Sequence, residues 1–290
     1  MAKTVIATDS NSGITQSKAK KLGVYVLPMS FNVNEKTYRE EINLSQKDFY
    51  KMISETKTVV STTQPSITEL TDFWKRLLKE NDEVVYIPMS SGLSSSCSTA
   101  LMLSEEFNGR VHVVNNQRIS VTQYQSVADA AAMAKTGLSG EKIKSRLERD
   151  KLESSIYIMV NNLSYLKKGG RITTAAAVIA SVMNLKPVLQ IQGEKLDAYS
   201  RCRGIKAAKE SMLGAMHKDF DGRFKEYVKN GEMSLMYSYS DMPDDEVDHW
   251  KKEIEKSFPG MKLRGEPLSL SIGCHIGPGS LAIACAKITK

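Results

Sequence analysis

The sequence predicts an α/β fold of two subdomains, the first a parallel sheet with helices on both faces and the second a mixed or antiparallel sheet with helices. Short apolar runs alternate with amphipathic stretches through the first half, a rhythm typical of parallel sheets. The second half is less regular and carries a hairpin signal at Gly193-Glu194. The length of 290 residues allows one large domain or two medium ones.

In the first half, each apolar run is followed by local signals that start a helix. Ser45 precedes one helix, and Ser66 with Glu69 forms a capping box before another. Gly23 is placed to end the first helix. The predicted strands are 3–8, 24–33, 83–88 and 111–115, and the predicted helices are 15–22, 45–54, 66–79, 126–135, 141–151 and one that begins at Ser94.

The second half is predicted to start near residue 156, which divides the chain at approximately 1–160 and 161–290. A Lys-Lys-Gly-Gly-Arg turn at 167–171 comes first, and a glycine-rich turn at 273–279 precedes the last strand. The other predicted elements are a helix at 173–183, a hairpin of 187–191 and 195–200, a helix at 204–217, a strand at 233–239, a helix after Pro243, and strands at 262–267 and 281–286.

Composition and charge exclude several functional classes. No apolar run approaches the ~18 residues of a membrane span, and the first residues are too short an apolar run for a signal peptide. The four cysteines show no CxxC pair, which predicts reduced thiols, a cytoplasmic protein and no metal site. The net charge of +7 is spread over helical stretches without an aromatic-studded basic run, so we expect no nucleic-acid partner.

Three hydroxyl-rich loops follow predicted strands of the first half, at 9–13, 61–66 and 90–96. Ligands of open parallel sheets bind beyond the carboxyl ends of the strands, and helix starts lined by hydroxyls bind anions. The pattern of a nucleoside-triphosphate loop is absent, so a small anion such as a carboxylate fits better. His275, within the glycine-rich turn, is a candidate donor or general base. Its neighbour Cys274 is interpreted as structural, because adjacent residues of an extended segment point in opposite directions.

Several segments together resemble the DegV family of fatty-acid-binding proteins. They occur in the family's order and span essentially the whole chain, which predicts a DegV domain over residues 3–288. The segments are Thr8-Asp9-Ser10, Thr62-Thr63-Gln64-Pro65-Ser66, Ser90-Ser91-Gly92-Leu93-Ser94, the run 163–172, Lys186-Pro187, Arg201-Cys202-Arg203 and His275-Ile276-Gly277-Pro278-Gly279.

The resemblance implies a DegV-like fold in which the first domain buries the acyl chain of a long-chain fatty acid. Its carboxylate is then held by Thr62 and Ser94, with His275 nearby on a loop that returns to the lipid site, and Arg171 supplies a positive charge. The supporting loop residues are Thr63, Ser91, Gly92 and Gly277. The only ligand implied is the fatty acid, without a cofactor, and the implied partner is an ATP-binding fatty-acid kinase subunit that forms the acyl phosphate, with no catalytic residue from this chain.

The sequence departs from the family pattern beside the lipid loops. Ser95-Ser96 stand where the family has Gly-Thr, and Asn115-Asn116 stand where it has Asp-Ser. A glycine-rich turn is replaced by Val121-Thr122-Gln123. We expect the carboxylate loop to be retained, and we expect these departures to affect the far end of the tunnel and therefore the preferred acyl chain.

Two other interpretations stay open from the residues alone. Asp9, His275 and a serine such as Ser94 are the groups of a Ser/His hydrolase acting on an acyl ester, although no G-x-S-x-G elbow occurs. The densest basic stretch begins with Arg201 and Arg203 and continues to Lys206 and Lys209; it predicts either an exposed helix start or a docking surface for an acidic partner or an anionic membrane.

Overall fold

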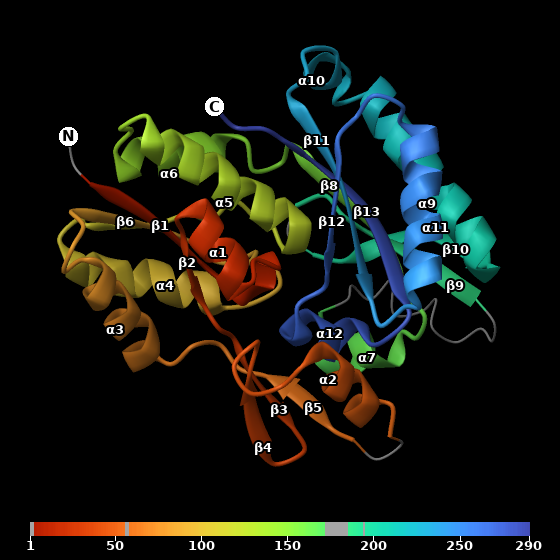
Figure 1. Ribbon diagram of the computed structural model, residues 1–290, viewed down its shortest axis with the longest axis horizontal. Helices are drawn as coiled ribbons and strands as arrows, with labels where there is room; N and C mark the ends of the chain where they lie inside the picture. Colours follow the sequence, from red (N-terminus) through yellow and green to blue (C-terminus); the bar gives the residue numbers. More distant parts are fainter. Residues whose placement is uncertain (1–2, 56–57, 172–184, 194) are drawn as a thin grey trace.

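The computed structural model describes residues 3–55, 58–171, 185–193 and 195–290, and within them the chain forms three sheets (Figure 1). The first is a parallel sheet of order β2-β1-β6-β7. Its strands are β1 (Thr4–Asp9), β2 (Tyr25–Leu27), β6 (Glu83–Ile87) and β7 (Val111–Val113). The predicted helix at 173–183 lies outside the described residues.

Helices cover both faces of the parallel sheet, as predicted. Successive strand residues point to opposite faces, so Ile6 packs in one apolar cluster while Val5 and Ala7 pack in another. The helices of the first face are α1 (Gln16–Leu22), α5 (Ser120–Lys135) and α6 (Gly140–Arg149), and those of the second are α3 (Ile67–Leu77) and α4 (Ser96–Ser104). Two 3-10 turns, Ser10–Ser12 and Glu105–Phe107, complete this part.

The second sheet has six strands in the order β10-β9-β8-β13-β11-β12 and is mixed, because only β11 and β12 run parallel. Its strands are β8 (Ser154–Met159), β9 (Leu185–Ile191), β10 (Asp197–Arg203), β11 (Met233–Ser240), β12 (Leu263–Pro267) and β13 (Ser280–Lys287). The predicted hairpin is the antiparallel pair β9 and β10. Since β8 belongs to this sheet, the change of sheet precedes Ser154, whereas the predicted division lies at about residue 160.

The six-stranded sheet is covered differently on its two faces. One face packs against α9 (Gly204–Asp221), α10 (Lys225–Lys229) and α11 (Asp244–Ser257). The other face shares an apolar cluster with Leu93, Ile119 and Val121, which belong to the first part of the chain. The second face is therefore buried against the loops that follow the parallel strands, and the two parts meet there.

A third, antiparallel sheet of order β4-β3-β5 was not predicted. Its strands are β3 (Ser30–Val33), β4 (Lys36–Arg39) and β5 (Val60–Thr62), and it packs with α2 (Gln46–Ile53) and α12 (Leu270–Ile276) at the bottom of Figure 1. The single strand predicted at 24–33 is wrong. Pro28 interrupts it, because proline lacks the N–H that a ladder needs, and the chain then enters the small sheet.

Local corrections concern the starts of two helices and the glycine-rich turn. The helix predicted from Ser94 begins at Ser96, and the one predicted from Ser126 begins at Ser120. The segment predicted as a turn at 273–279 is mostly helix α12, which Ser269 caps by accepting a hydrogen bond from the Ile272 N–H. The argument that Cys274 and His275 point apart in an extended segment therefore does not apply.

Candidate functional site

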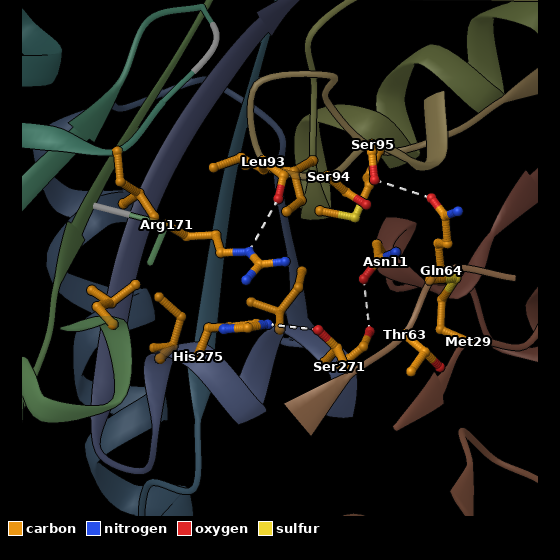
Figure 2. A pocket seen from close by; sticks show the side chains of 17 residues that line it. Asn11, Met29, Thr63, Gln64, Leu93, Ser94, Ser95, Arg171, Ser271 and His275 are labelled. Atoms are coloured by element: carbon orange, nitrogen blue, oxygen red, sulfur yellow. Dashed lines mark hydrogen bonds between the residues drawn. The ribbon is translucent and has the colours of Figure 1, made fainter. Parts of the chain in front are cut away.

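A cavity of about 220 Å³ lies where the loops after the parallel strands meet β5 and α12 (Figure 2). It has a polar and an apolar set of lining side chains. The polar set is Asn11, Thr62, Thr63, Gln64, Ser94, Ser95, Arg171, Ser271 and His275. The apolar set is Met29, Met89, Leu93, Ile119, Leu166, Leu196, Ile272 and Ile276. The predicted residues Ser91, Gly92 and Gly277 are not among the lining residues and lie in the segments that carry Ser94 and His275.

The resemblance implied that the first domain alone buries the acyl chain. The cavity instead extends beyond the first subdomain. Leu166 comes from α7 (Ser164–Gly169), and Leu196 lies between β9 and β10. Both belong to the apolar cluster that covers the inner face of the six-stranded sheet. The apolar lining therefore comes from both parts of the molecule.

Thr62 and His275, which lie 213 positions apart, form a hydrogen-bonded pair at the cavity. Thr62 Oγ1 and His275 Nε2 are 2.8 Å apart. Thr62 is the last residue of β5, where pairing with Phe31 fixes its backbone, and His275 lies in the last turn of α12. Gly169 makes room for the ring, since a Cβ at this position would lie 2.2 Å from His275 Nδ1. The structure thus brings together two side chains that the family resemblance had assigned to one site.

Burial holds His275 in its neutral form. Burial, with the positive charge of Arg171 acting in the same direction, lowers the pKa of His275 to about 4. A neutral imidazole carries one N–H and one acceptor nitrogen, so the pair with Thr62 joins two uncharged groups. One hydrogen lies between the two groups, so a carboxylate arriving beside this pair would meet one uncommitted neutral donor, the Thr62 O–H when the imidazole donates to Thr62.

Arg171 connects the end of α7 to the loop that carries Ser94. Its Nε donates to the Leu93 carbonyl at 3.3 Å, and its Nη1 donates to the Gly169 carbonyl. The side chain approaches the cavity from the same side as His275, opposite Ser94 and Gln64 (Figure 2). The guanidinium thus places a positive charge at the polar part of the cavity without burying it.

The serine loop supplies further hydroxyls but not in the predicted capping role. The N-cap of α4 is Ser95, whose side chain donates to Gln64 Oε1 at 3.1 Å instead of capping the helix. Ser94 Oγ accepts a hydrogen bond from the Ser96 N–H at 3.1 Å. Ser94 therefore keeps its own hydroxyl hydrogen for a partner in the cavity, because accepting one bond leaves the O–H donor uncommitted.

Asn11 is a cavity residue that sequence reasoning did not single out. Its side chain is 2% exposed, and its Oδ1 accepts a hydrogen bond from Ser271 Oγ at 2.7 Å. Its Nδ2 has no hydrogen-bond partner among the described residues. Buried amide donors are normally paired, so this N–H₂ group, on a residue that lines the cavity and whose side chain also acts to lower the pKa of Asp9, is a candidate donor to an acceptor bound there. The only sequence signal was its place in the loop 9–13.

Glu40 is a second residue that sequence reasoning missed, and it holds α12 in position. Its carboxyl accepts hydrogen bonds from the Leu270 N–H, from Ser10 Oγ at 2.8 Å and from Ser271 Oγ at 3.4 Å. Burial raises the pKa of Glu40 to about 7. The first turn of the helix that carries His275 is thus anchored by the carboxyl group of the residue that follows β4.

The geometry does not assemble the triad of a Ser/His hydrolase. His275 pairs with Thr62, while the Asp9 carboxylate accepts bonds from the backbone of Met89 and Asn11 and from Gln123. Cys274 is no nucleophile either, because burial raises the pKa of its thiol to about 12. Within the described part of the chain, no group of three metal-ligating side chains occurs.

The basic stretch divides into an exposed and a buried part. Arg201 and Arg203 are exposed on β10, an edge strand of the six-stranded sheet. Lys209 is buried, with its ammonium 3.3 Å from Glu253 and over the Trp250 ring, so it is not part of a docking surface. No helix among the described residues is long and apolar enough to cross a membrane.

Comparison with known proteins identifies the family of this chain. The sequence profile described as an uncharacterised protein of the DegV family matches residues 3–287. The chain belongs to the DegV family. It is 28% identical to Protein DegV of Bacillus subtilis over 285 residues, covering 97% of this chain and 99% of that one. A DegV domain-containing protein of Deinococcus radiodurans is 32% identical over 203 residues, 70% of this chain and 72% of that one.

Solved DegV structures share the whole fold. One, described as showing fatty acid binding of a DegV family protein from Thermus thermophilus, superposes with a TM-score of 0.88 at 29% identity, covering 99% of this chain and 100% of that one. Bacillus subtilis DegV, described as a fatty acid binding protein, superposes with a TM-score of 0.84 at 26% identity and the same coverage. The predicted α/β fold with a parallel and a mixed sheet is confirmed.

Proposed function

We propose that this DegV protein binds a long-chain fatty acid, with its carboxylate on Thr62, Ser94, Asn11 and His275 beside Arg171 and its acyl chain along the apolar lining. The observation that carries the proposal is the polar part of the cavity, where a buried Asn11 amide offers an unpaired donor. A buried carboxylate is very costly without several donors, and this site supplies them. The two DegV relatives described as fatty acid binding support the same ligand class.

The two ends of the ligand make different energetic demands. Each methylene moved out of water contributes roughly 0.8 kcal/mol, so a chain of about sixteen carbons supplies ample favourable free energy even after ordering losses. Apolar burial alone does not choose a carboxylic acid over an alcohol or an alkane. That choice is made by donors, because each hydrogen bond to a charged acceptor contributes about 1.5–3 kcal/mol.

We further propose that the bound acid is presented to an ATP-binding kinase subunit in the cytoplasm. A carboxylate oxygen would attack the γ-phosphorus of ATP on the partner, forming the acyl C–O–P bond. The bond between that phosphorus and ADP breaks, and its electron pair stays on ADP. Neutral donors such as Thr62 support this role, because they leave the carboxylate nucleophilic. In this proposal Arg201 and Arg203 dock the partner and contact an anionic membrane surface transiently, and the chain itself holds no catalytic residue.

The Asn11→Asp variant tests the carboxylate site. The shape of the side chain and its bond from Ser271 are retained, while a donor becomes a negatively charged acceptor. Palmitate affinity, measured by displacement of a fluorescent fatty acid at pH 8, is expected to fall at least tenfold, the loss of one charged hydrogen bond. Asn162→Asp, at an exposed position, is the control. Unchanged palmitate affinity in Asn11→Asp, or a wild-type protein that yields no fatty acid by mass spectrometry and binds none, would reject the proposal.

A further inference from the structure

A second hollow, of about 400 Å³, adjoins the lipid cavity on the side of β5 and α7. The two share three lining residues, Thr62, Arg171 and His275. The other lining residues of the second hollow are Thr58, Val59, Val60, Ser61, Tyr165, Lys168, Gly169 and Cys274. The hydrogen-bonded pair of Thr62 and His275 therefore faces both spaces, and a carboxylate held on this pair lies at the boundary of the second hollow.

The second hollow has the charge and the donors of an anion site. Lys168 and Arg171 are both exposed cations, and Ser61 adds a hydroxyl that accepts a bond from Asn32 and keeps its own hydrogen. The hydroxyls of Thr58 and Tyr165 also line the hollow, but they donate to backbone carbonyls. No carboxylate is among its described lining residues, and within the described part of the chain Lys168 forms no ion pair. The Cys274 thiol adds no negative charge, because burial raises its pKa to about 12. Of Lys168 and Arg171, only Arg171 also lines the neighbouring lipid cavity.

We infer that the second hollow receives the phosphoryl group that becomes joined to the fatty acid, with Lys168 and Arg171 as its cationic partners. The inference rests on the proposed function. A phosphoryl group on the carboxylate adds about one further negative charge and extends the headgroup beyond Thr62 and His275. A lysine ammonium serves as a point charge for phosphate, and an arginine can bind it with two parallel hydrogen bonds. Lys168, which does not line the lipid cavity, thus distinguishes the acyl phosphate from the free acid.

The test compares two ligands that share one acyl chain. Palmitate carries the carboxylate alone, and hexadecanoyl phosphonate, in which the acyl carbon bonds directly to phosphorus, is a non-hydrolysable mimic of the acyl phosphate. Both displace a fluorescent fatty acid from wild-type protein, from Lys168→Gln and from Lys167→Gln. Lys167 is the matched control, since it is the exposed neighbour on α7 and does not line either space. Wild-type protein is expected to bind both ligands.

The expected result is a loss confined to one ligand and one variant. Lys168→Gln weakens the phosphonate about five- to tenfold, the effect of one charge pair near the surface, and leaves palmitate within about twofold. Lys167→Gln changes neither, and the loss shrinks at high salt because exposed charges are screened. The inference is overturned, while palmitate binding stands, if Lys168→Gln loses affinity equally for both ligands or for neither. It is also overturned if wild-type protein does not bind the phosphonate. A wild-type protein that binds no palmitate overturns the proposed function and the inference together.

Discussion

Replacing Gly169 by alanine should damage the lipid site through a single methyl group. Gly169 is the last residue of α7, and its backbone is not in the left-handed region, so alanine fits the local conformation. The added Cβ would lie 2.2 Å from His275 Nδ1, whereas ordinary contacts begin near 3.4 Å. The ring or the helix must therefore move by about 1.2 Å, the difference between these two distances. The 2.8 Å bond between His275 and Thr62 does not survive a shift of that size.

The size of the effect follows from two opposing terms. Overpacking a filled site costs about 1–3 kcal/mol, while alanine in place of a helical glycine returns about 0.5–1 kcal/mol. We expect Gly169→Ala to lower the free energy of unfolding by up to about 2 kcal/mol. Palmitate affinity should fall about tenfold or more, because His275 no longer aligns the Thr62 hydroxyl for a charged acceptor.

Two further variants separate the steric effect from a general one. Gly214→Ala, in α9, has open space around the added Cβ and should stabilise the protein by about 0.5–1 kcal/mol without changing palmitate affinity. In a double-mutant cycle, Gly169→Ala should cost no stability when His275 is already alanine, since the clashing ring is absent. Chemical denaturation and displacement titration give both quantities. Wild-type affinity in Gly169→Ala, or the same cost of Gly169→Ala with and without the His275 ring, would refute the reasoning.

Two other predictions concern Glu40 and the exposed arginines. Because burial raises the pKa of Glu40 from 4.5 to about 7, its contribution to stability is complete below pH 4.5 and is lost as the pH rises through 7. Over that range, wild-type protein should lose about 3 kcal/mol of unfolding free energy relative to Glu40→Gln. Urea denaturation at several pH values measures this difference. Parallel curves of unfolding free energy against pH for the two proteins would contradict the prediction. Arg201→Glu with Arg203→Glu should slow association with the proposed kinase subunit at least tenfold, measured by stopped flow, and leave palmitate affinity unchanged. Loss of palmitate binding would contradict the separate docking role.

Local signals were sufficient where a structure depends on neighbours in the chain. The capping box of Ser66 and Glu69 forms with both of its reciprocal bonds, because its partners are three residues apart. β9 and β10 pair antiparallel, as the Gly193-Glu194 dipeptide between two runs predicted. The alternation of apolar runs and amphipathic stretches likewise predicted the parallel sheet and its two helical layers.

Local signals failed where packing between distant segments decided the conformation. Glycines at 273, 277 and 279 predicted a turn, yet Gly273 lies inside α12. The glycine there serves a close packing contact, since a Cβ would lie 2.7 Å from the Tyr50 hydroxyl. The apolar run at 24–33 gave no indication that its two halves enter different sheets. Glu40 was not singled out from the sequence, because its burial depends on a contact with Leu270, 230 residues away.

The sequence by itself determined the α/β class, the starts of several helices and the hydroxyl-rich loops, since periodicity, capping and turn chemistry depend on residues within a few positions. The family resemblance added Thr62, Ser94, His275 and Arg171 as a set. Only the tertiary structure decided that Asn11 offers an unpaired donor, that both parts of the chain line the cavity, and that Lys168 lies in an adjoining hollow. The physical reason is that burial and hydrogen-bond satisfaction are properties of a side chain's surroundings in space, which residues far along the chain supply.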